Sequence, residues 1–496
     1  MLIVTQYREK ISFKEFLFKT QENNLYLKVA IILSLLQLII YKYIYPFPNF
    51  LNGDTWIYIL NAQSNAKIAI HPIGYAMFLR IFSAITISDT ALVIFQFLLL
   101  YLASLFLNFT LYYFLAPSRN IKIFLLISVF INPIFPLIAN TISSDNVCLS
   151  LGIIWFGLLL WIIYKPSTSI FFWHAAVLFL AFTMRFNAIF FPIISLIAFC
   201  LSKSSYRQKI LGFVCCILFV GSFVMYNRER YFQLCGIRQF APFSGWQMAN
   251  NALYAYRYVT PSKHIKVPVK FEKLDSLVCN YFINAPLDKE NTLESKRALD
   301  GYLWEQKSPL WIYFHKYVDK NYTGEYKYWA VIAPFYYEYG RWIIIHYPKE
   351  FIQNVVFPHI QWWLIPPMYS LEHYNGGLIN IISKDIIKWF EYDSGLITTR
   401  LLDRNKLDGV YGIYPYWTLI INISFWILVF SFIVQKGRLR NPILFKSIIL
   451  VSFFWVINFS FNVFASQIEL RYLLFPVHIM TVFSILIFGS LVKTST

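Results

Sequence analysis

Residues 90–115 read TALVIFQFLLLYLASLFLNFTLYYFL, and none of these side chains carries a charge. A helix needs about 20 mostly apolar residues to cross a bilayer, so this stretch predicts a transmembrane helix. Nine further stretches predict spans in the same way, at 29–45, 121–141, 146–164, 169–183, 186–201, 210–226, 417–435, 447–465 and 472–491. The chain is therefore expected to be an all-α polytopic membrane protein with about ten transmembrane helices.

The composition of the whole chain agrees with this fold class. Of its 496 residues, 58% are hydrophobic and 14% are charged, whereas about a quarter are charged in a soluble domain. The net charge of +18 comes largely from short turns between alternate spans, which hold Arg119, Lys122, Lys165, Lys203, Arg207, Lys209, Lys436, Arg438, Arg440 and Lys446. Basic turns mark the cytoplasmic side, so both termini are predicted to be cytoplasmic and the charge does not indicate nucleic-acid binding.

The segments between spans on the opposite side of the membrane are longer, and the longest of them divides the chain into three parts. Residues 1–226 form an N-terminal transmembrane module with a first external loop at 46–89, and 417–496 form the C-terminal spans. Between them, 227–416 is long enough for a mixed extracytoplasmic domain. In this region FIQNVVFPHIQWWLIP (351–366) is too short to span and is predicted to lie at the membrane interface. A disulfide between Cys235 and Cys279 is left open.

Candidate functional side chains gather at the external ends of the predicted spans. Ionisable groups near a membrane are costly, so each is a functional hypothesis. Five segments contribute to this level: Asp54 (NGDTW), His71 and Tyr75 (HPIGY), Asp145 (SSDN), Arg185 and Asn187 (RFN), and Glu469, Arg471 and Tyr472 (ELRY). This alternation along the chain predicts one site on the external face.

The two aspartates are candidate catalytic carboxylates. A transfer to a hydroxyl needs a base for the acceptor proton, and an Asp at the water–membrane boundary can be tuned for this role. Asp54 is our candidate base, and Asp145 is a candidate second carboxylate. For both residues the competing interpretation is a helix N-cap, which Asp favours.

The two arginines are candidate phosphate ligands, because a guanidinium can hold phosphate oxygens through two parallel hydrogen bonds. For Arg185 and Arg471 the alternative is snorkelling to the interface, and Arg471 has a further alternative in an ion pair with Glu469. His71 next to Pro72 is interpreted first as a loop-shaping residue and second as a ligand. No metal site is predicted, because no His, Cys and Asp cluster has metal-ligand spacing.

In this order along the chain, the motifs resemble those of the GT-C superfamily of integral membrane glycosyltransferases. They are most similar to the bacterial branch of protein O-mannosyltransferases and the aminoarabinose transferase of lipid A. The resemblance rests on Asp54 in the first loop, the string H-P-x-G-Y-x-x-F-L from His71, the Ser144-Asp145 turn, the Arg185-x-Asn187 turn and the Glu469-x-Arg471-Tyr472 string. Members of this family usually have two adjacent acids where this chain has Gly53-Asp54-Thr55, which leaves open whether Asp145 supplies the second.

The resemblance implies an inverting transferase in a bacterial inner membrane, with its active site on the extracytoplasmic face. It would take a sugar from a polyprenyl-phosphate or diphosphate carrier and pass it to a glycolipid, polysaccharide or protein hydroxyl. Asp54 would be the base, and Arg471 and Arg185 would hold the phosphate. No cofactor is implied, and a divalent cation stays open.

Two other classes of function are compatible with ten spans. A transporter or flippase of lipid-linked sugars usually places polar groups near the bilayer midplane and has repeated halves, which this sequence lacks. A non-catalytic membrane scaffold would use the large region as a binding module. A scaffold function does not explain why four charged residues lie at the same external boundary of the membrane, namely Asp54, Asp145, Arg185 and Arg471.

Overall fold

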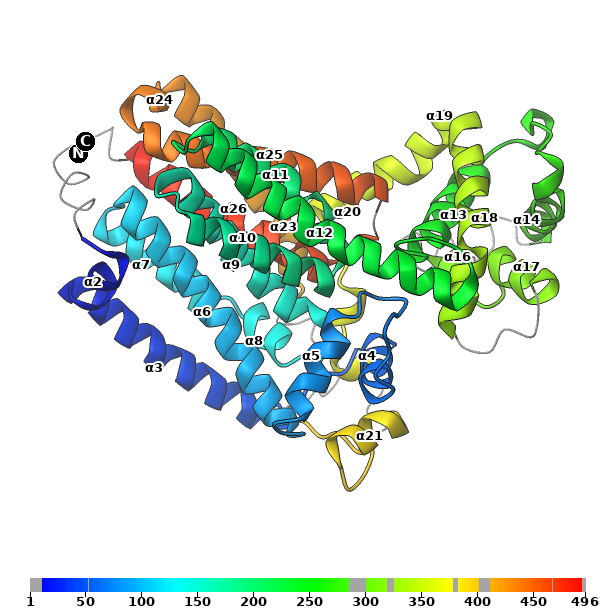
Figure 1. Cartoon of the computed structure of the whole chain (residues 1–496), viewed down its shortest axis with the longest axis horizontal. Helices are drawn as coiled ribbons and strands as arrows, with labels where there is room; N and C mark the ends of the chain where they lie inside the picture. The colour runs from blue at the N-terminus through cyan, green and yellow to red at the C-terminus, as the bar shows by residue number, and fades with distance from the viewer. Residues whose placement is uncertain are drawn as a thin grey trace.

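The computed structural model describes residues 11–51, 53–284, 300–318, 325–377, 382–400, 411–465 and 467–492. Seven helices in this part of the chain are long and apolar enough to cross a membrane. They are α3 (Gln21–Ile44), α6 (Asp89–Leu115), α9 (Ser144–Tyr164), α12 (Tyr206–Cys235), α23 (Tyr414–Val434), α25 (Pro442–Ala465) and α26 (Leu470–Val492). They lie alongside one another in a bundle, as expected of a polytopic membrane protein (Figure 1).

The other three predicted spans form shorter helices. The stretch 121–141 is divided into α7 (Arg119–Phe130) and α8 (Ile134–Ala139). The break lies at Pro133, which has no N–H for a continuous helix and instead precedes the first turn of α8. The remaining two stretches form α10 (Thr168–Met184) and the pair η1 (Phe186–Phe190) and α11 (Phe191–Leu201).

Side-chain contacts identify the end of the bundle that holds the predicted basic turns. The Tyr164 hydroxyl donates to the Ile443 carbonyl at 2.6 Å, and Lys446 Nζ donates to the Leu201 carbonyl at 3.2 Å. The ends of α9 and α11 therefore meet the start of α25. The start of α3 and the end of α26 lie at the same end (Figure 1).

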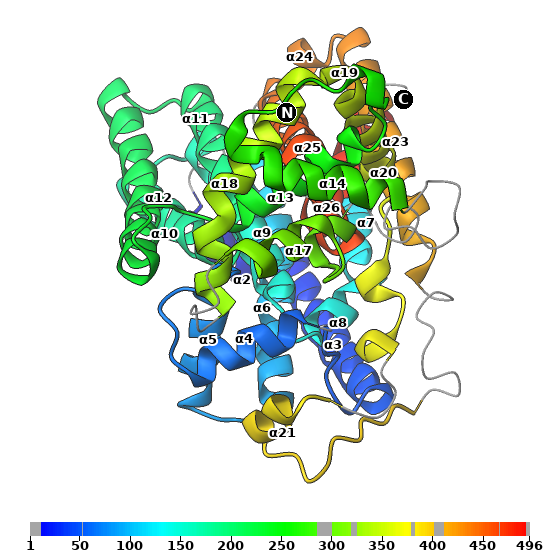
Figure 2. The same ribbon diagram turned by 90° about the vertical axis from the view of Figure 1, so that its right-hand side faces the viewer.

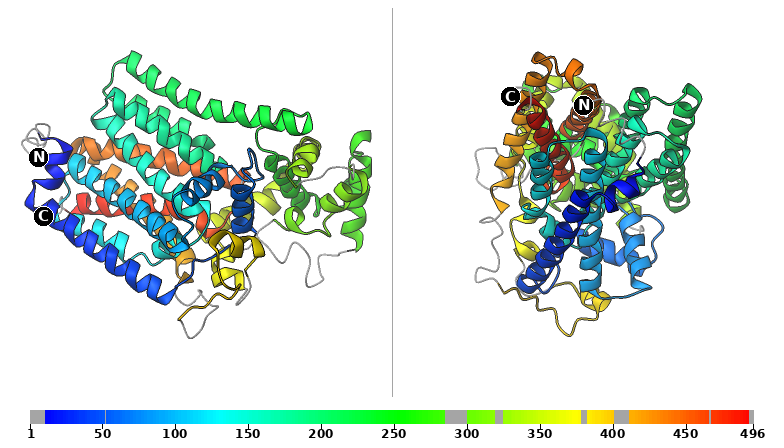
Figure 3. Two further views of the ribbon diagram at one scale, coloured as in Figure 1. Left: turned by 60° about the horizontal axis from the view of Figure 1, so that its bottom comes forward. Right: turned by 90° about the vertical axis from the view of Figure 1, so that its left-hand side faces the viewer.

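The opposite end carries the first loop and the large region. In the first loop lie α4 (Asp54–Gln63) and α5 (Gly74–Ser83). The large region does not begin at the expected boundary of 226 and 227, because α12 continues without a break to Cys235. In Figure 3 this helix runs the length of the bundle and reaches the helices that follow it.

The regular elements described within 227–416 are all helices, so the expected mixed region is wrong for this part of the chain. No strand occurs among the residues that the structure describes, where one isolated bridge pairs Asn49 with Thr141. The elements of the region are α13 (Phe243–Tyr256), η2 (Pro261–Lys263), η3 (Val269–Phe271), α14 (Glu272–Asn284), α16 (Gly301–Trp304), α17 (Pro309–Tyr317), α18 (Glu325–His346), α19 (Pro348–Phe351), η4 (Ile352–Val356), α20 (Phe357–Leu364), η5 (Tyr369–Leu371), η6 (Tyr374–Gly377) and α21 (Lys384–Phe390). The short helices α2 (Phe13–Phe18) and α24 (Gly437–Arg440) lie outside it.

Two helices of this region, α13 and α18, pack closely against each other at glycine residues. At Gly245 in α13 a Cβ atom would lie 2.0 Å from the Ala333 carbonyl oxygen of α18, and at Gly340 in α18 it would lie 2.6 Å from the Met248 carbonyl oxygen. The two helices cross at these glycines and lie beyond the end of the bundle (Figures 1 and 2). Cys235 and Cys279 are both unpaired.

The predicted interfacial stretch forms the helical segment α19–η4–α20. It packs back on the bundle, where the buried His359 places Nδ1 2.8 Å from the carbonyl oxygen of Val463 in α25. The segment therefore leads the chain from the outlying helices back to the end of the bundle where α26 begins.

Candidate functional site

Arg471 is the centre of a buried group of charges. It is the second residue of α26, and its side chain is 7% exposed. Its Nη1 donates to Asp54 Oδ2 at 2.5 Å and to Asp145 Oδ2 at 3.3 Å, and its Nε donates to Glu469 Oε2 at 2.9 Å. One guanidinium thus contacts carboxylates from the start of α4, the start of α9 and the residues just before α26.

Arg185 completes what we call the charged cluster, which consists of Asp54, Asp145, Arg185, Glu469 and Arg471. Arg185 caps the C-terminus of α10 and forms a close ion pair with Asp145. Asp145 is therefore held between two guanidinium groups. The ion pairs replace the interfacial snorkelling that was the alternative for both arginines.

Three contacts with aromatic rings and hydroxyl groups fix the orientation of the arginines. The Arg185 guanidinium lies 4.4 Å from the centre of the Tyr472 ring, and its Nε donates to Ser144 Oγ at 3.2 Å. The Tyr472 hydroxyl in turn accepts a hydrogen bond of 2.5 Å from Arg471 Nη2. Tyr472 therefore connects the two basic groups through its ring face and its hydroxyl.

Backbone pairing explains why two aspartates far apart in sequence meet. The Asn49 N–H donates to the Asn140 carbonyl at 2.8 Å, and the Ile142 N–H donates to the Asn49 carbonyl at 2.9 Å. The chain segments that lead into α4 and α9 thus run side by side. Each helix then begins a few residues later, which places Asp54 and Asp145 at neighbouring helix starts.

Neither aspartate is the N-cap of its helix. Gly53, with φ of +83°, occupies the cap position of α4, and this left-handed conformation costs glycine little. The cap of α9 is Ser143, whose Oγ accepts from the Asp145 N–H at 3.3 Å and donates to Asp145 Oδ2 at 2.9 Å. Because other residues cap the helices, both carboxylates are available to the arginines.

Three other residues predicted for the site differ in how close they lie to the cluster. His71 Nε2 lies 3.6 Å from Asp54 Oδ1. Tyr75 lies one layer behind, packed edge-on against Tyr58, and its hydroxyl donates to Gln96 Oε1 at 2.8 Å. Asn187 lies in η1, and in the described part of the chain no hydrogen bond or ion pair joins its side chain to the cluster.

The cluster has an outer and an inner layer. The side chains of Asp54 and His71 are 21% exposed and that of Arg185 is 18% exposed. In contrast, Asp145, Glu469 and Arg471 are between 2% and 7% exposed. A ligand would reach the outer layer first, and the inner layer would hold the outer one in place.

The protonation of the outer layer follows from its neighbours. Burial by itself raises the pKa of Asp54, but the charge of Arg471, the charge of His71 when it is protonated and the hydrogen bond from Arg471 lower it to about 2. Burial lowers the pKa of His71 below its ordinary value of 6.5, with the nearby carboxylate of Asp54 opposing this shift. At neutral pH the site therefore holds an ionised aspartate beside a neutral imidazole.

Sequence reasoning missed several residues that support the cluster. Ser370 Oγ donates to Glu469 Oε2 at 2.8 Å, and Gln467 Nε2 donates to Asp300 Oδ2 at 2.8 Å and to Glu469 Oε1 at 3.2 Å. These contacts join the large region to the inner layer. Gln467 lies two residues before Glu469, so it could have been found next to that string. Ser370 and Asp300 have no such signal, because their contacts depend on how the region folds back.

Tyr58 could have been found from the sequence. It lies four residues after Asp54 on α4, a spacing that places both on one helix face. Its hydroxyl lies 2.9 Å from Ser144 Oγ, and its ring lies 5.5 Å from that of His71. It therefore bridges the helix that carries Asp54 and the helix that carries Asp145.

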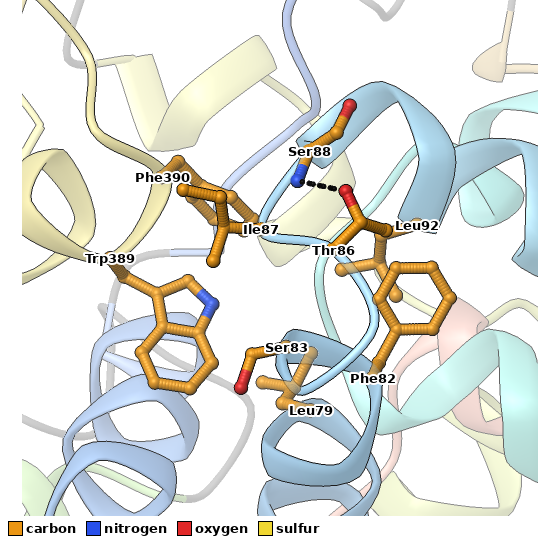
Figure 4. A pocket seen from close by; sticks show the side chains of 9 residues that line it. All are labelled: Leu79, Phe82, Ser83, Thr86, Ile87, Ser88, Leu92, Trp389 and Phe390. Carbon is orange, nitrogen blue, oxygen red and sulfur yellow. Dashed lines mark hydrogen bonds between the residues drawn. The ribbon is translucent and has the colours of Figure 1, made fainter.

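The cluster is not arranged as a metal centre. Among the described residues, no group of three or more His, Cys, Asp or Glu side chains could hold a metal ion. The oxygens of Asp54, Asp145 and Glu469 that would serve as ligands face guanidinium groups instead. A pocket elsewhere, lined by Phe82, Trp389 and other residues of α5, α21 and the turn into α6, is apolar and contains no residue of the charged cluster (Figure 4).

The described part of the chain is thus helical, with seven helices that could cross a membrane, and a buried cluster of charged side chains lies at one end of its bundle. Comparison of the chain with protein-family models, with curated proteins and with solved structures gives no match.

Proposed function

We propose that this protein is a membrane glycosyltransferase of the GT-C type, which moves a sugar from a polyprenyl-phosphate-linked donor to an acceptor hydroxyl. The observation that carries the proposal is that four segments of the chain bring Asp54, Asp145, Arg185, Glu469 and Arg471 into one cluster with an accessible outer layer. The proposed site faces the extracytoplasmic side of a bacterial inner membrane, because the basic turns belong to the opposite end of the bundle.

Stability alone is a poor reason for such a cluster. Removing charges from water costs several kcal/mol per ion, and apolar side chains of similar volume often stabilise a protein as well or better. Five charged side chains, each at most 21% exposed, therefore favour a role in chemistry.

The outer layer supplies the groups that the proposed transfer needs. As the acceptor oxygen forms a bond to the anomeric carbon, its O–H bond breaks and Asp54 accepts the proton. The bond from the anomeric carbon to the phosphate oxygen breaks at the same time, and its electron pair leaves with the phosphate. Attack from the face opposite the leaving group inverts the configuration of the sugar.

The structure favours different roles for the two arginines from those expected from the sequence. Arg185 is more exposed than Arg471 and belongs to the outer layer, so we assign the donor phosphate to Arg185. Arg471 is enclosed by three carboxylates and would position Asp54. In this assignment Asp145 orients Arg185, and Glu469 orients Arg471.

The proposal is tested by comparing glycans of host cells that carry the wild-type protein or Asp54→Asn. Mass spectrometry of the lipid, polysaccharide and protein fractions should show one sugar lost in one fraction, which also identifies the acceptor class. Asp393→Asn is the matched control, because Asp393 is exposed and lies outside the cluster. Identical profiles for the folded Asp54→Asn variant and the wild type would contradict the transferase.

A further inference from the structure

We infer that His71 is the proton-accepting partner of Asp54, so that the two side chains together receive the proton of the acceptor hydroxyl. This inference rests on the proposed function and extends it to a residue that sequence reasoning treated first as loop-shaping. Its main support is geometric: His71 Nε2 lies 3.6 Å from Asp54 Oδ1.

The Nε2 atom of His71 is shielded and has no hydrogen-bond partner in the described part of the protein. An unpaired buried nitrogen costs free energy, because its hydrogen bond to water is lost without replacement. The ring is held in this position by packing against Tyr58, with the ring centres 5.5 Å apart. The atom therefore lies near Asp54 Oδ1, at 3.6 Å, and forms no hydrogen bond elsewhere in the described part of the chain.

Asp54 alone is poorly matched to the role of a base at neutral pH. Its contact with Arg471 holds its pKa at about 2, and a base works best when its pKa lies near the operating pH. A second group must therefore keep the proton after transfer. His71 is the nearest neutral acceptor; burial lowers its pKa below 6.5, and the carboxylate of Asp54 opposes that shift.

The proton balance of the step is simple. The acceptor O–H bond breaks, Asp54 Oδ1 receives the proton, and the proton passes to His71 Nε2. The resulting imidazolium faces the Asp54 carboxylate, which stabilises it, and it releases the proton to water when the product leaves. No oxidant, reductant or further reactant is needed.

All charged groups around His71 affect its titration. The carboxylates of Asp54 on α4 and Asp145 on α9 raise its pKa, and the guanidinium groups of Arg185 and Arg471 lower it, as does burial. The pKa of His71 therefore lies below 6.5, so the imidazole is neutral at pH 7 and becomes protonated only when the pH falls through this lowered pKa. The transfer rate should therefore decline in this acidic range.

The test is the pH dependence of transfer by the full-length protein in detergent micelles. The donor is the total polyprenyl-phosphate lipid extract of the host membrane, and the acceptor is the fraction identified by glycan profiling. We expect the wild-type rate to fall below pH 6.5, and His71→Gln to be slower by about 10- to 100-fold, with no such fall in this range. His346→Gln, which changes an exposed histidine, should keep the wild-type profile.

Two further measurements keep the outcomes distinct. Thermal unfolding shows whether His71→Gln is folded, and His71→Asn replaces it if it is not. The double variant Asp54→Asn, His71→Gln should be no slower than Asp54→Asn alone, because the two residues act as a unit. Transfer by His71→Gln with an unchanged rate and acidic decline would overturn this inference but not the transferase. A wild-type protein that transfers no sugar would overturn both.

Discussion

At the residue scale, Arg471 holds the carboxylates of the charged cluster in place. Its three nitrogens contact three carboxylates and a tyrosine hydroxyl, a pattern that suits the fixed fork of a guanidinium. A lysine at this position would keep the charge but reach fewer of these oxygens. The carboxylate oxygens that lose their contact with the guanidinium would then destabilise the protein, although Asp145 keeps Arg185 and Glu469 keeps Ser370 and Gln467.

We therefore predict that Arg471→Lys lowers the free energy of unfolding by about 2–3 kcal/mol, somewhat less than complete removal of a buried partner. The change is measured as a lower midpoint of thermal unfolding in detergent. Arg207→Lys, at an exposed position in the first turn of α12, should leave the midpoint unchanged. Equal midpoints for the wild type and Arg471→Lys would contradict the central position of Arg471.

The same scale shows what sequence patterns can predict about a site. Asp54, Asp145, Arg185, Glu469 and Arg471 could be selected because charged side chains at the ends of apolar stretches are rare and costly. Their division into two layers could not be predicted, because exposure depends on packing. Ser370 could not be selected either, since an isolated serine has no distinguishing pattern.

At the element scale, the site depends on how α5 meets the end of α10. A Cβ atom on Gly74 would lie 2.5 Å from the backbone oxygen of Thr183, two residues before Arg185. The absence of a side chain at Gly74 therefore lets α5 approach α10 closely. This approach brings His71, three residues earlier, near the arginine.

We predict that Gly74→Ala separates α5 from α10, destabilises the protein by about 1–3 kcal/mol and lowers the transfer rate. Gly221→Ala is the matched control, because nothing lies within 4 Å of a Cβ atom at that position in α12. It should stabilise its helix by about 0.8–1 kcal/mol and leave the rate unchanged. The two effects are compared by thermal unfolding and by transfer assays, and equal behaviour of both variants would refute the tight approach at Gly74.

Sequence patterns predicted which stretches form helices better than they predicted where those helices break or end. Long uncharged stretches such as 90–115 gave α6 with nearly the expected bounds, because length and hydropathy decide a span. The break at Pro133 and the extension of α12 to Cys235 were missed. Hydropathy averaged along a stretch does not detect a single proline, and it does not follow a helix into polar sequence.

At the scale of the whole molecule, the two ends of the bundle have different roles in this account. The end with the basic turns is assigned to the cytoplasm, and the end with the charged cluster to the opposite side. Ser64 lies at the cluster end directly after α4, and Arg207 lies at the other end. Both side chains are exposed, so each position can report on its side of the membrane.

We predict that Ser64→Cys, in a chain without the native cysteines, reacts with a membrane-impermeant maleimide in intact cells. Arg207→Cys should react only after the membrane is permeabilised. The yield of labelled protein, measured by mass shift, distinguishes the two cases. The reverse pattern would invert the topology, and labelling of both in intact cells would contradict a bundle that separates the two ends.

The central claim is that the charged cluster transfers a sugar, and the most direct test uses purified protein in lipid vesicles. The donor lipid extract and the acceptor fraction identified by glycan profiling are supplied, and the transferred sugar and its anomeric configuration are measured by mass spectrometry and NMR. We expect transfer with inversion by the wild type and by Asp393→Asn, and a loss of at least about 100-fold for folded Asp54→Asn. Transfer by Asp54→Asn at the wild-type rate would contradict the account. Transfer by the wild type with retention of configuration would contradict it too.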